Sequence, residues 1–115
     1  MHHEVEIIMI IEIEDKKLES LILYGKSEDR EYRKLQCKKT FMKDLDKVMS
    51  ILRTVPNAMG LSSYRSLHYE RLKYDLSGLS SVRIGFRSPY RLLFTEFDDG
   101  IRISLIEISS HYGDK

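Results

Sequence analysis

A hairpin pattern near the carboxyl end constrains the fold of this chain more than any other feature. Two runs of mainly aliphatic, β-branched and aromatic residues, YRLLFTEF at 90–97 and IRISLIEIS at 101–109, flank DDG at 98–100. Asp-Gly between such runs is a strong hairpin signal, because both residues tolerate the positive φ angles of tight turns. A third run, SVRIGFR at 81–87, precedes a turn at 88–89. The sequence therefore predicts an antiparallel three-stranded meander.

The amino-terminal part of the chain predicts a strand and a short helix. Residues 5–13 combine β-branched and aliphatic side chains with partial alternation, which is typical of a strand. Asp15 stands where a helix N-cap is expected, and residues 16–25 carry apolar side chains at helical spacing before a closing Gly25. Continuation of strand structure through residues 21–24 is the alternative for this segment.

The middle of the chain predicts one long helix between less regular segments. Residues 26–35 are polar and predict a loop or a frayed turn. Residues 40–55 predict an amphipathic helix that ends before Pro56, because a proline disfavours helical conformation in the preceding residue. Residues 61–72 predict an irregular or short helical connector. The apolar residues at helical spacing in the long helix are Phe41, Leu45, Val48, Met49 and Leu52.

These segments predict an α+β fold, in which an amino-terminal strand and helices pack on an antiparallel sheet and the meander forms the carboxyl end. The chain has 115 residues, 42% of them apolar, with no repeat and no linker rich in proline or glycine. That length is typical of one domain with a modest core. We therefore expect a single domain over residues 1–115.

The cysteine content and the hydropathy of the sequence indicate in which cellular compartment the protein is expected. The single Cys37 excludes an internal disulfide framework, and no Cys/His spacing is typical of a zinc site. We expect a reducing compartment, the cytoplasm, and no bound metal. The apolar run at 5–13 is too short to span a bilayer and is interrupted by Glu6 and Glu12. We therefore expect neither a signal peptide nor a membrane-spanning segment.

The formal net charge of +1 hides a basic middle between two acidic ends. Residues 30–53 carry eight Lys or Arg against three Asp or Glu, and residues 64–93 carry six against two. The first excess has a simple alternative, the solvated lysine face of a helix. In the second, most cations are arginines interleaved with tyrosines, and guanidinium groups suit phosphates while aromatic rings suit unpaired bases. The second block therefore favours RNA as a partner.

Five elements of the carboxyl-terminal region occur in a characteristic order. They are LKYDLSG at 72–78, SVRI at 81–84, YRLLF at 90–94, the acidic turn at 98–100 and HY at 111–112. In these elements the chain resembles the RelE/YoeB/HigB superfamily of type II toxin-antitoxin ribonucleases, which includes toxins of the plasmid maintenance killer type. The resemblance implies a small RelE-like domain, and the amino-terminal half matches it only in outline, as a strand followed by helices.

The resemblance also implies a general base for RNA cleavage at a 2′-hydroxyl. Glu70 matches the YoeB-type base, three residues ahead of Lys73 in the sequence. His68 is the competing candidate, because HigB-like members place a catalytic histidine just before the corresponding Leu-Lys pair. The distance from His68 to Lys73 is two residues longer than that pattern expects. A solvent-exposed connector glutamate is the plain alternative for Glu70.

Three cations match the basic positions of the superfamily. Lys73, Arg83 and Arg91 would bind the scissile phosphate and neutralise its oxygens. An ion pair with an acidic strand neighbour, such as Glu96 or Glu107, is the alternative for Arg83.

The carboxyl terminus supplies the last two implied site residues. His111 matches the histidine acid that protonates the departing 5′-oxygen, and an imidazole with an unperturbed pKa of about 6.5 is partly protonated near neutral pH. Tyr112 would stack on or orient the base beside the cut, or else anchor the end of the strand. A tail at 113–115 follows the tyrosine and adds an aspartate and the terminal carboxylate near a site meant for phosphate.

The function that the resemblance implies is that of a toxin that cleaves mRNA on the ribosome, an mRNA interferase. Such a toxin uses neither a metal nor an organic cofactor, contacts ribosomal RNA, and is silenced by a cognate antitoxin in a toxin–antitoxin hetero-oligomer. Two alternatives keep the fold without the nuclease. One is an antitoxin-binding partner in DNA autorepression, and the other is a ParE-like toxin of DNA gyrase. The histidine and tyrosine at 111–112 favour the ribonuclease.

Overall fold

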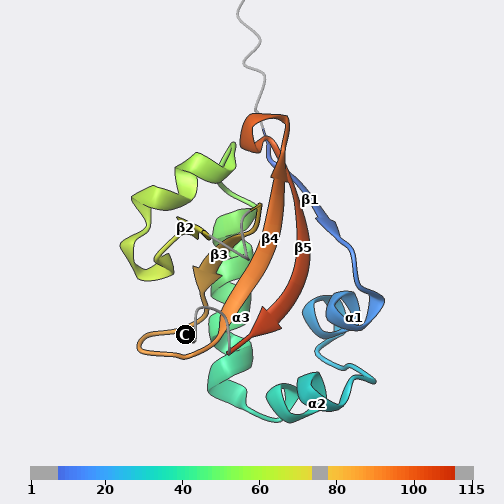
Figure 1. Cartoon of the computed structure of the whole chain (residues 1–115). Helices are drawn as coiled ribbons and strands as arrows, with labels where there is room; N and C mark the ends of the chain where they lie inside the picture. Colours follow the sequence, from blue (N-terminus) through green and yellow to red (C-terminus); the bar gives the residue numbers. More distant parts are fainter. Residues whose placement is uncertain (1–7, 74–77, 111–115) are drawn as a thin grey trace, which may run out of the picture.

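The protein has one five-stranded mixed sheet with helices packed against it (Figure 1). The structure is a computed structural model and describes residues 8–73 and 78–110. The strand order is β1-β5-β4-β3-β2. The strands are β1 (Ile10–Ile13), β2 (Glu70–Arg71), β3 (Ser80–Arg83), β4 (Arg91–Phe97) and β5 (Arg102–Ser109). The predicted α+β class is confirmed.

The antiparallel meander predicted at the carboxyl end is the centre of the sheet. Strand β4 pairs with β3 on one side and with β5 on the other, both antiparallel. The acidic turn Asp98–Gly100 joins β4 to β5, and Asp98 and Asp99 both have positive φ, as the hairpin signal requires. The register shifts by one residue between Leu93 and Phe94, which is a β-bulge. The bulge lets Leu105 and Ile108 both be buried although their spacing departs from strict alternation.

Two edge strands complete the sheet beside the meander, the predicted amino-terminal strand β1 and the strand β2, which was not predicted. Strand β1 starts at Ile10 and pairs in parallel with β5, so the sheet is mixed and not purely antiparallel. Residues 5–7 of the predicted first strand lie outside the described residues. Strand β2 lies within the predicted connector at 61–72 and pairs with β3. With two residues, β2 is too short to give a periodic signal in the sequence.

The first and third helices agree with the sequence. Helix α1 (Lys16–Tyr24) begins after Asp15, whose carboxylate accepts a hydrogen bond of 2.7 Å from the backbone N–H of Lys17. It ends at Gly25 in the left-handed conformation, so the strand alternative for residues 21–24 is wrong. Helix α3 (Lys39–Leu52) lies behind the sheet in Figure 1. Its buried residues are the five that the helical spacing predicted: Phe41, Leu45, Val48, Met49 and Leu52.

The prediction of a loop at 26–35 is wrong, because helix α2 (Arg30–Gln36) forms there. The carboxylate of Asp29 accepts hydrogen bonds from the backbone N–H groups of Glu31 and Tyr32, at 3.0 and 3.1 Å. Tyr32 and Leu35, one turn apart, are the buried residues of this helix. An N-cap and two anchoring side chains therefore stabilise a helix whose polar composition conceals it.

One hydrophobic core joins the helices to the sheet. It includes Leu18 of α1, Leu35 of α2 and Leu45 of α3 together with Phe94 and Leu105 of the sheet. Two short 3-10 helices, η1 (Ala58–Ser63) and η2 (Arg65–Leu67), follow α3 and add further buried residues to the same core. They carry the chain to β2 at the sheet edge. In the part of the chain that the structure describes, no helix is long and apolar enough to cross a membrane.

Candidate functional site

The strand registers place four polar side chains on one face of the sheet. Glu70 in β2 lies opposite Ser81 in β3, and Arg83 in β3 lies opposite Arg91 in β4. Because side chains two residues apart on a strand share a face, these cross-strand pairs lie on the same side. Three segments that are separate in the sequence therefore meet around Arg91.

Arg91 is buried, with 5% of its surface exposed. Its Nε donates a hydrogen bond of 2.9 Å to the hydroxyl oxygen of Ser81, and its Nη2 donates to the backbone carbonyl of His68. These two bonds hold the guanidinium plane in one orientation. A buried cation with fixed donors is suited to binding an anionic oxygen, because little reorganisation is needed when the anion arrives.

Glu70 faces this guanidinium. The Oε1 atom of Glu70 lies 3.8 Å from Nη2 of Arg91, and the glutamate side chain is half exposed. At this separation the two groups attract each other, and the carboxylate keeps solvent-facing surface for a further contact. The pair can therefore present a proton acceptor beside a cationic donor to the same small group.

His68 occupies a strained position at the end of η2. Its backbone is left-handed, with φ at 44°, and it is an exposed residue whose carbonyl is the group that contacts Arg91. A non-glycine residue at positive φ costs free energy, and such residues are concentrated at functional sites. The structure thus brings His68 to the site through its backbone.

Lys73 and Arg83 differ in their relation to Arg91. Lys73 lies two residues beyond β2, is exposed, and makes no ion pair or hydrogen bond with the residues that the structure describes. Arg83 is half-buried and directly opposite Arg91. Within residues 8–73 and 78–110, Arg83 has no ion pair, and Glu96 binds Arg71 instead, with 3.2 Å between Oε1 and Nη2. The alternative, an ion pair of Arg83 with Glu96 or Glu107, is therefore wrong.

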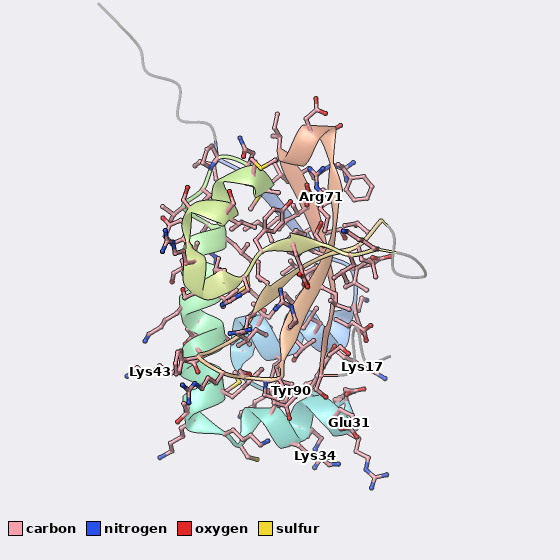
Figure 2. The ribbon with its side chains drawn as sticks, turned by 60° about the vertical axis from the view of Figure 1, so that its left-hand side comes forward. Lys17, Glu31, Lys34, Lys43, Arg71 and Tyr90 are labelled. Atoms are coloured by element: carbon pink, nitrogen blue, oxygen red, sulfur yellow. The ribbon has the colours of Figure 1, made fainter. Side chains whose placement is uncertain are left out.

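Sequence reasoning missed the polar cluster that holds β2 in place. Glu96 in β4 accepts hydrogen bonds from the hydroxyls of Tyr69 and Ser80, the latter at 2.6 Å, and from Arg71 at 3.2 Å. In Figure 2, Arg71 lies beside the β4–β5 hairpin, far from Tyr90 at the end of the sheet near α2. Tyr69 and Arg71 flank Glu70, so by strand alternation the cluster directs Glu70 to the opposite face, toward Arg91.

The electrostatics of this cluster follow from its contacts. Burial opposes ionisation of Glu96, but the hydrogen bonds from Ser80 and Tyr69 and the charge of Arg71 outweigh it and lower the pKa of Glu96. Burial raises the pKa of the Tyr69 hydroxyl, and its hydrogen bond to Glu96 raises it further. The carboxylate is therefore ionised and the phenol is protonated near neutral pH. The sequence signals for this cluster were Tyr-Glu-Arg at 69–71 and the serine pair at 80–81. Their common partner, Glu96 in β4, is too distant in the sequence for these signals to identify it.

The remaining predicted site residues, His111 and Tyr112, lie outside the described residues, as does the tail at 113–115. Strand β5 ends at Ser109, which is the cross-strand partner of Arg91. In the residues that the structure does describe, no group of three His, Cys, Asp or Glu side chains could hold a metal ion.

The chain has structural similarity, at low sequence identity, to known proteins. No family model matches the sequence, and no curated protein matches it. The chain is similar to a chain of a solved structure described as the heterotetrameric complex of YoeB-YefM toxin-antitoxin from Staphylococcus aureus, with 20% sequence identity and a TM-score of 0.47. The match covers 90% of this chain and 98% of that chain. The chemistry of the site follows from its own side chains.

Proposed function

We propose that the protein is the toxin of a type II toxin–antitoxin system and an endoribonuclease that cleaves mRNA on the ribosome in the cytoplasm. The observation that carries the proposal is the carboxylate of Glu70, 3.8 Å from the buried guanidinium of Arg91. In the sequence, the two residues also match the base and phosphate-binding positions of the superfamily that the carboxyl-terminal motifs resemble. Site geometry and motif order support the same function.

In the proposed reaction, Glu70 takes the proton of a ribose 2′-hydroxyl, and the 2′-oxygen attacks the adjacent phosphorus. A bond from the 2′-oxygen to phosphorus forms while the bond from phosphorus to the 5′-oxygen breaks. The products are a 2′,3′-cyclic phosphate and a 5′-hydroxyl, which receives its proton from His111. His68 is the alternative base. Tyr112 would stack on a base beside the cut.

The cations of the site stabilise the charge that develops on the phosphoryl oxygens. Arg83 and Arg91 lie directly opposite each other on neighbouring strands, an arrangement in which like charges repel. A phosphoryl group bound between them would reduce that repulsion. The two guanidinium groups would then stabilise the negative charge of the transition state. Lys73 would add a third cation from the segment after β2.

The proposed partners are a cognate antitoxin, in a toxin–antitoxin hetero-oligomer, and the ribosome with its mRNA. Helix α3 contributes cations that include Lys39, Lys43 and Lys47. Lys43 lies on the side of α3 away from the sheet (Figure 2), where contacts with ribosomal RNA need not compete with the site. A local cluster of cations such as these lysines affects binding to RNA more than the net charge of +1 does.

The test is to map mRNA ends in a translating extract after addition of purified protein. The variants are Glu70→Ala, His111→Ala and, as a matched control, Glu31→Ala on the exposed face of α2. Ribosome-dependent cuts that Glu31→Ala keeps and the two site variants lose support the proposal. Intact mRNA together with inhibited DNA gyrase would replace it with the ParE-like function. Intact mRNA with antitoxin binding and no growth arrest would leave a binding module.

A further inference from the structure

The turn between β3 and β4 presents an aromatic ring that the reaction described above does not use. Phe86 is 85% exposed, and the guanidinium carbon of Arg87 lies 5.0 Å from the centre of its ring. The backbone N–H of Ser88 donates to the carbonyl of Gly85 at 3.3 Å and closes the turn. Gly85 and Arg87 both have positive φ, at 97° and 56°. A non-glycine residue at positive φ, Arg87, and an exposed apolar ring, Phe86, are therefore neighbours in this turn, and both cost free energy.

A groove of about 490 Å³ adjoins this turn. It lies between α3, η2 and the turn itself, and His68 and Phe86 are among its lining residues. Its cations are Lys47, Arg65 and Arg83, and its apolar residues include Val48, Ile51 and Leu67. Of the described residues that line it, Asp44 is the one that carries a carboxylate. In the described part of the chain none of the three cations has an ion pair, so their charge is available to a ligand.

The turn is fixed to the scaffold and to the arginine pair. A Cβ atom added to Gly85 would lie 2.6 Å from Oδ2 of Asp44, so the turn backbone approaches α3 closely. At its two ends the turn connects β3, which finishes at Arg83, to β4, which starts at Arg91. The position of Phe86 relative to the proposed phosphate site is therefore fixed. Phe86, His68 and Arg83 line the same groove.

We propose that Phe86 is a stacking platform for an unpaired RNA base, and that Arg87, Lys47 and Arg65 bind the flanking phosphates. The inference rests on the proposed function and assigns a position for a nucleotide next to the cleaved bond. With Arg87, the three groove cations make four positive charges beside one described carboxylate, which is a suitable site for a polyanion. An aromatic ring next to a guanidinium group is suited to stacking on a flat π-system. Single-stranded RNA is the ligand that combines the two.

The experiment measures fluorescence anisotropy of a labelled single-stranded RNA oligonucleotide that is 2′-O-methylated throughout and so cannot be cleaved at a 2′-hydroxyl. Phe86→Ala should weaken binding about 5- to 100-fold, as expected for loss of one stacked base. Phe86→Trp should bind within about threefold of the unaltered protein, because tryptophan retains a stacking face. The substituted side chain is almost fully exposed, so both variants should keep the unaltered circular dichroism spectrum and melting temperature.

The chain offers a matched control at the other end of β4. Phe97 is also exposed, and Arg102 lies 4.3 Å from the centre of its ring, yet this pair is not part of the groove. Phe97→Ala should leave RNA affinity unchanged. Equal affinity of Phe86→Ala and Phe97→Ala overturns the inference, and so does absence of RNA binding by the unaltered protein. Loss of antitoxin binding in Phe86→Ala with unchanged RNA binding assigns the ring to a protein interface and overturns it as well.

The two proposals fail in different ways. If mRNA is cut in the translating extract and Phe86→Ala binds RNA normally, the function stands and the stacking inference is wrong. If RNA binding depends on Phe86 but no mRNA is cut, the binding site stands and the nuclease is wrong.

Discussion

The carboxylate of Glu70 and the guanidinium of Arg91 lie 3.8 Å apart, and the two side chains differ in exposure, at 50% and 6%. The arginine is held by Ser81 and by the carbonyl of His68, whereas the glutamate retains access to solvent. The rigid guanidinium can bind an anion, and the accessible carboxylate can contact a ligand from the solvent side. The proposed acid–base cleavage would use both properties, with the guanidinium binding the phosphate and the carboxylate acting as the base.

Glu70→Gln should lower mRNA cleavage about 10²- to 10⁴-fold, because the amide keeps the shape of the side chain but cannot accept the proton. The free energy of unfolding should fall by about 1 kcal/mol or less, since the half-exposed carboxylate lies 3.8 Å from the guanidinium of Arg91. End mapping in a translating extract and urea unfolding measure the two quantities. Full cleavage by Glu70→Gln would transfer the base role to His68. The variant to examine then is His68→Asn, because asparagine tolerates the positive φ at that position.

Glu96 should make the free energy of unfolding decrease at acid pH. Burial opposes its ionisation, but hydrogen bonds and Arg71 lower its pKa in the folded protein below the ordinary value of 4.5. A group with a lowered folded pKa stabilises the protein fully above its unfolded pKa, and this contribution is lost as pH falls through the folded pKa. The stability advantage of the unaltered protein over Glu96→Gln should therefore shrink below about pH 4.5. Urea unfolding at several pH values checks this, and a difference that stays constant from neutral to acid pH would contradict it.

Tyr32→Phe should destabilise the protein by about 1–3 kcal/mol. The hydroxyl oxygen of Tyr32 accepts a hydrogen bond of 3.2 Å from the backbone N–H of Ile108 in a buried setting, and burial raises the pKa of this phenol. Without the hydroxyl, the N–H of Ile108 loses its partner away from water. Tyr24→Phe is the matched control, because Tyr24 is 75% exposed. Equal melting temperatures for the two variants would show that the hydroxyl of Tyr32 is not needed.

Gly85→Ala should destabilise the protein more than Gly78→Ala, although both glycines have φ of 97°. A Cβ at Gly78 meets no atom of the described residues within 4 Å, whereas a Cβ at Gly85 lies 2.6 Å from Asp44. Gly78→Ala therefore measures backbone strain alone, and Gly85→Ala adds a steric clash. The difference should diminish in Gly85→Ala combined with Asp44→Ala, which removes the clashing carboxylate. Denaturant unfolding of these variants beside the unaltered protein is the measurement, and equal loss at the two glycines would contradict the close approach to α3.

Local sequence signals were sufficient for much of the fold. The turn at 98–100 predicted the β4–β5 hairpin, Asp15 and Gly25 predicted both ends of α1, and the buried face of α3 followed from its spacing. Each of these depends on residues that are neighbours in the chain. Helix α2 was missed because only Tyr32 and Leu35 anchor it, and strand β2 because two residues carry no periodicity.

The sequence by itself determined which side chains are available for chemistry: a glutamate and a histidine ahead of a Leu-Lys pair, two strand arginines, and a histidine near the end. Only the tertiary structure decided how the described ones meet. The pairing of β2 with β3 and of β3 with β4 brings Glu70 to Arg91, and Glu96 holds β2 through Tyr69 and Arg71. These contacts join residues distant in the chain, so their energy depends on a sheet register that no short pattern encodes.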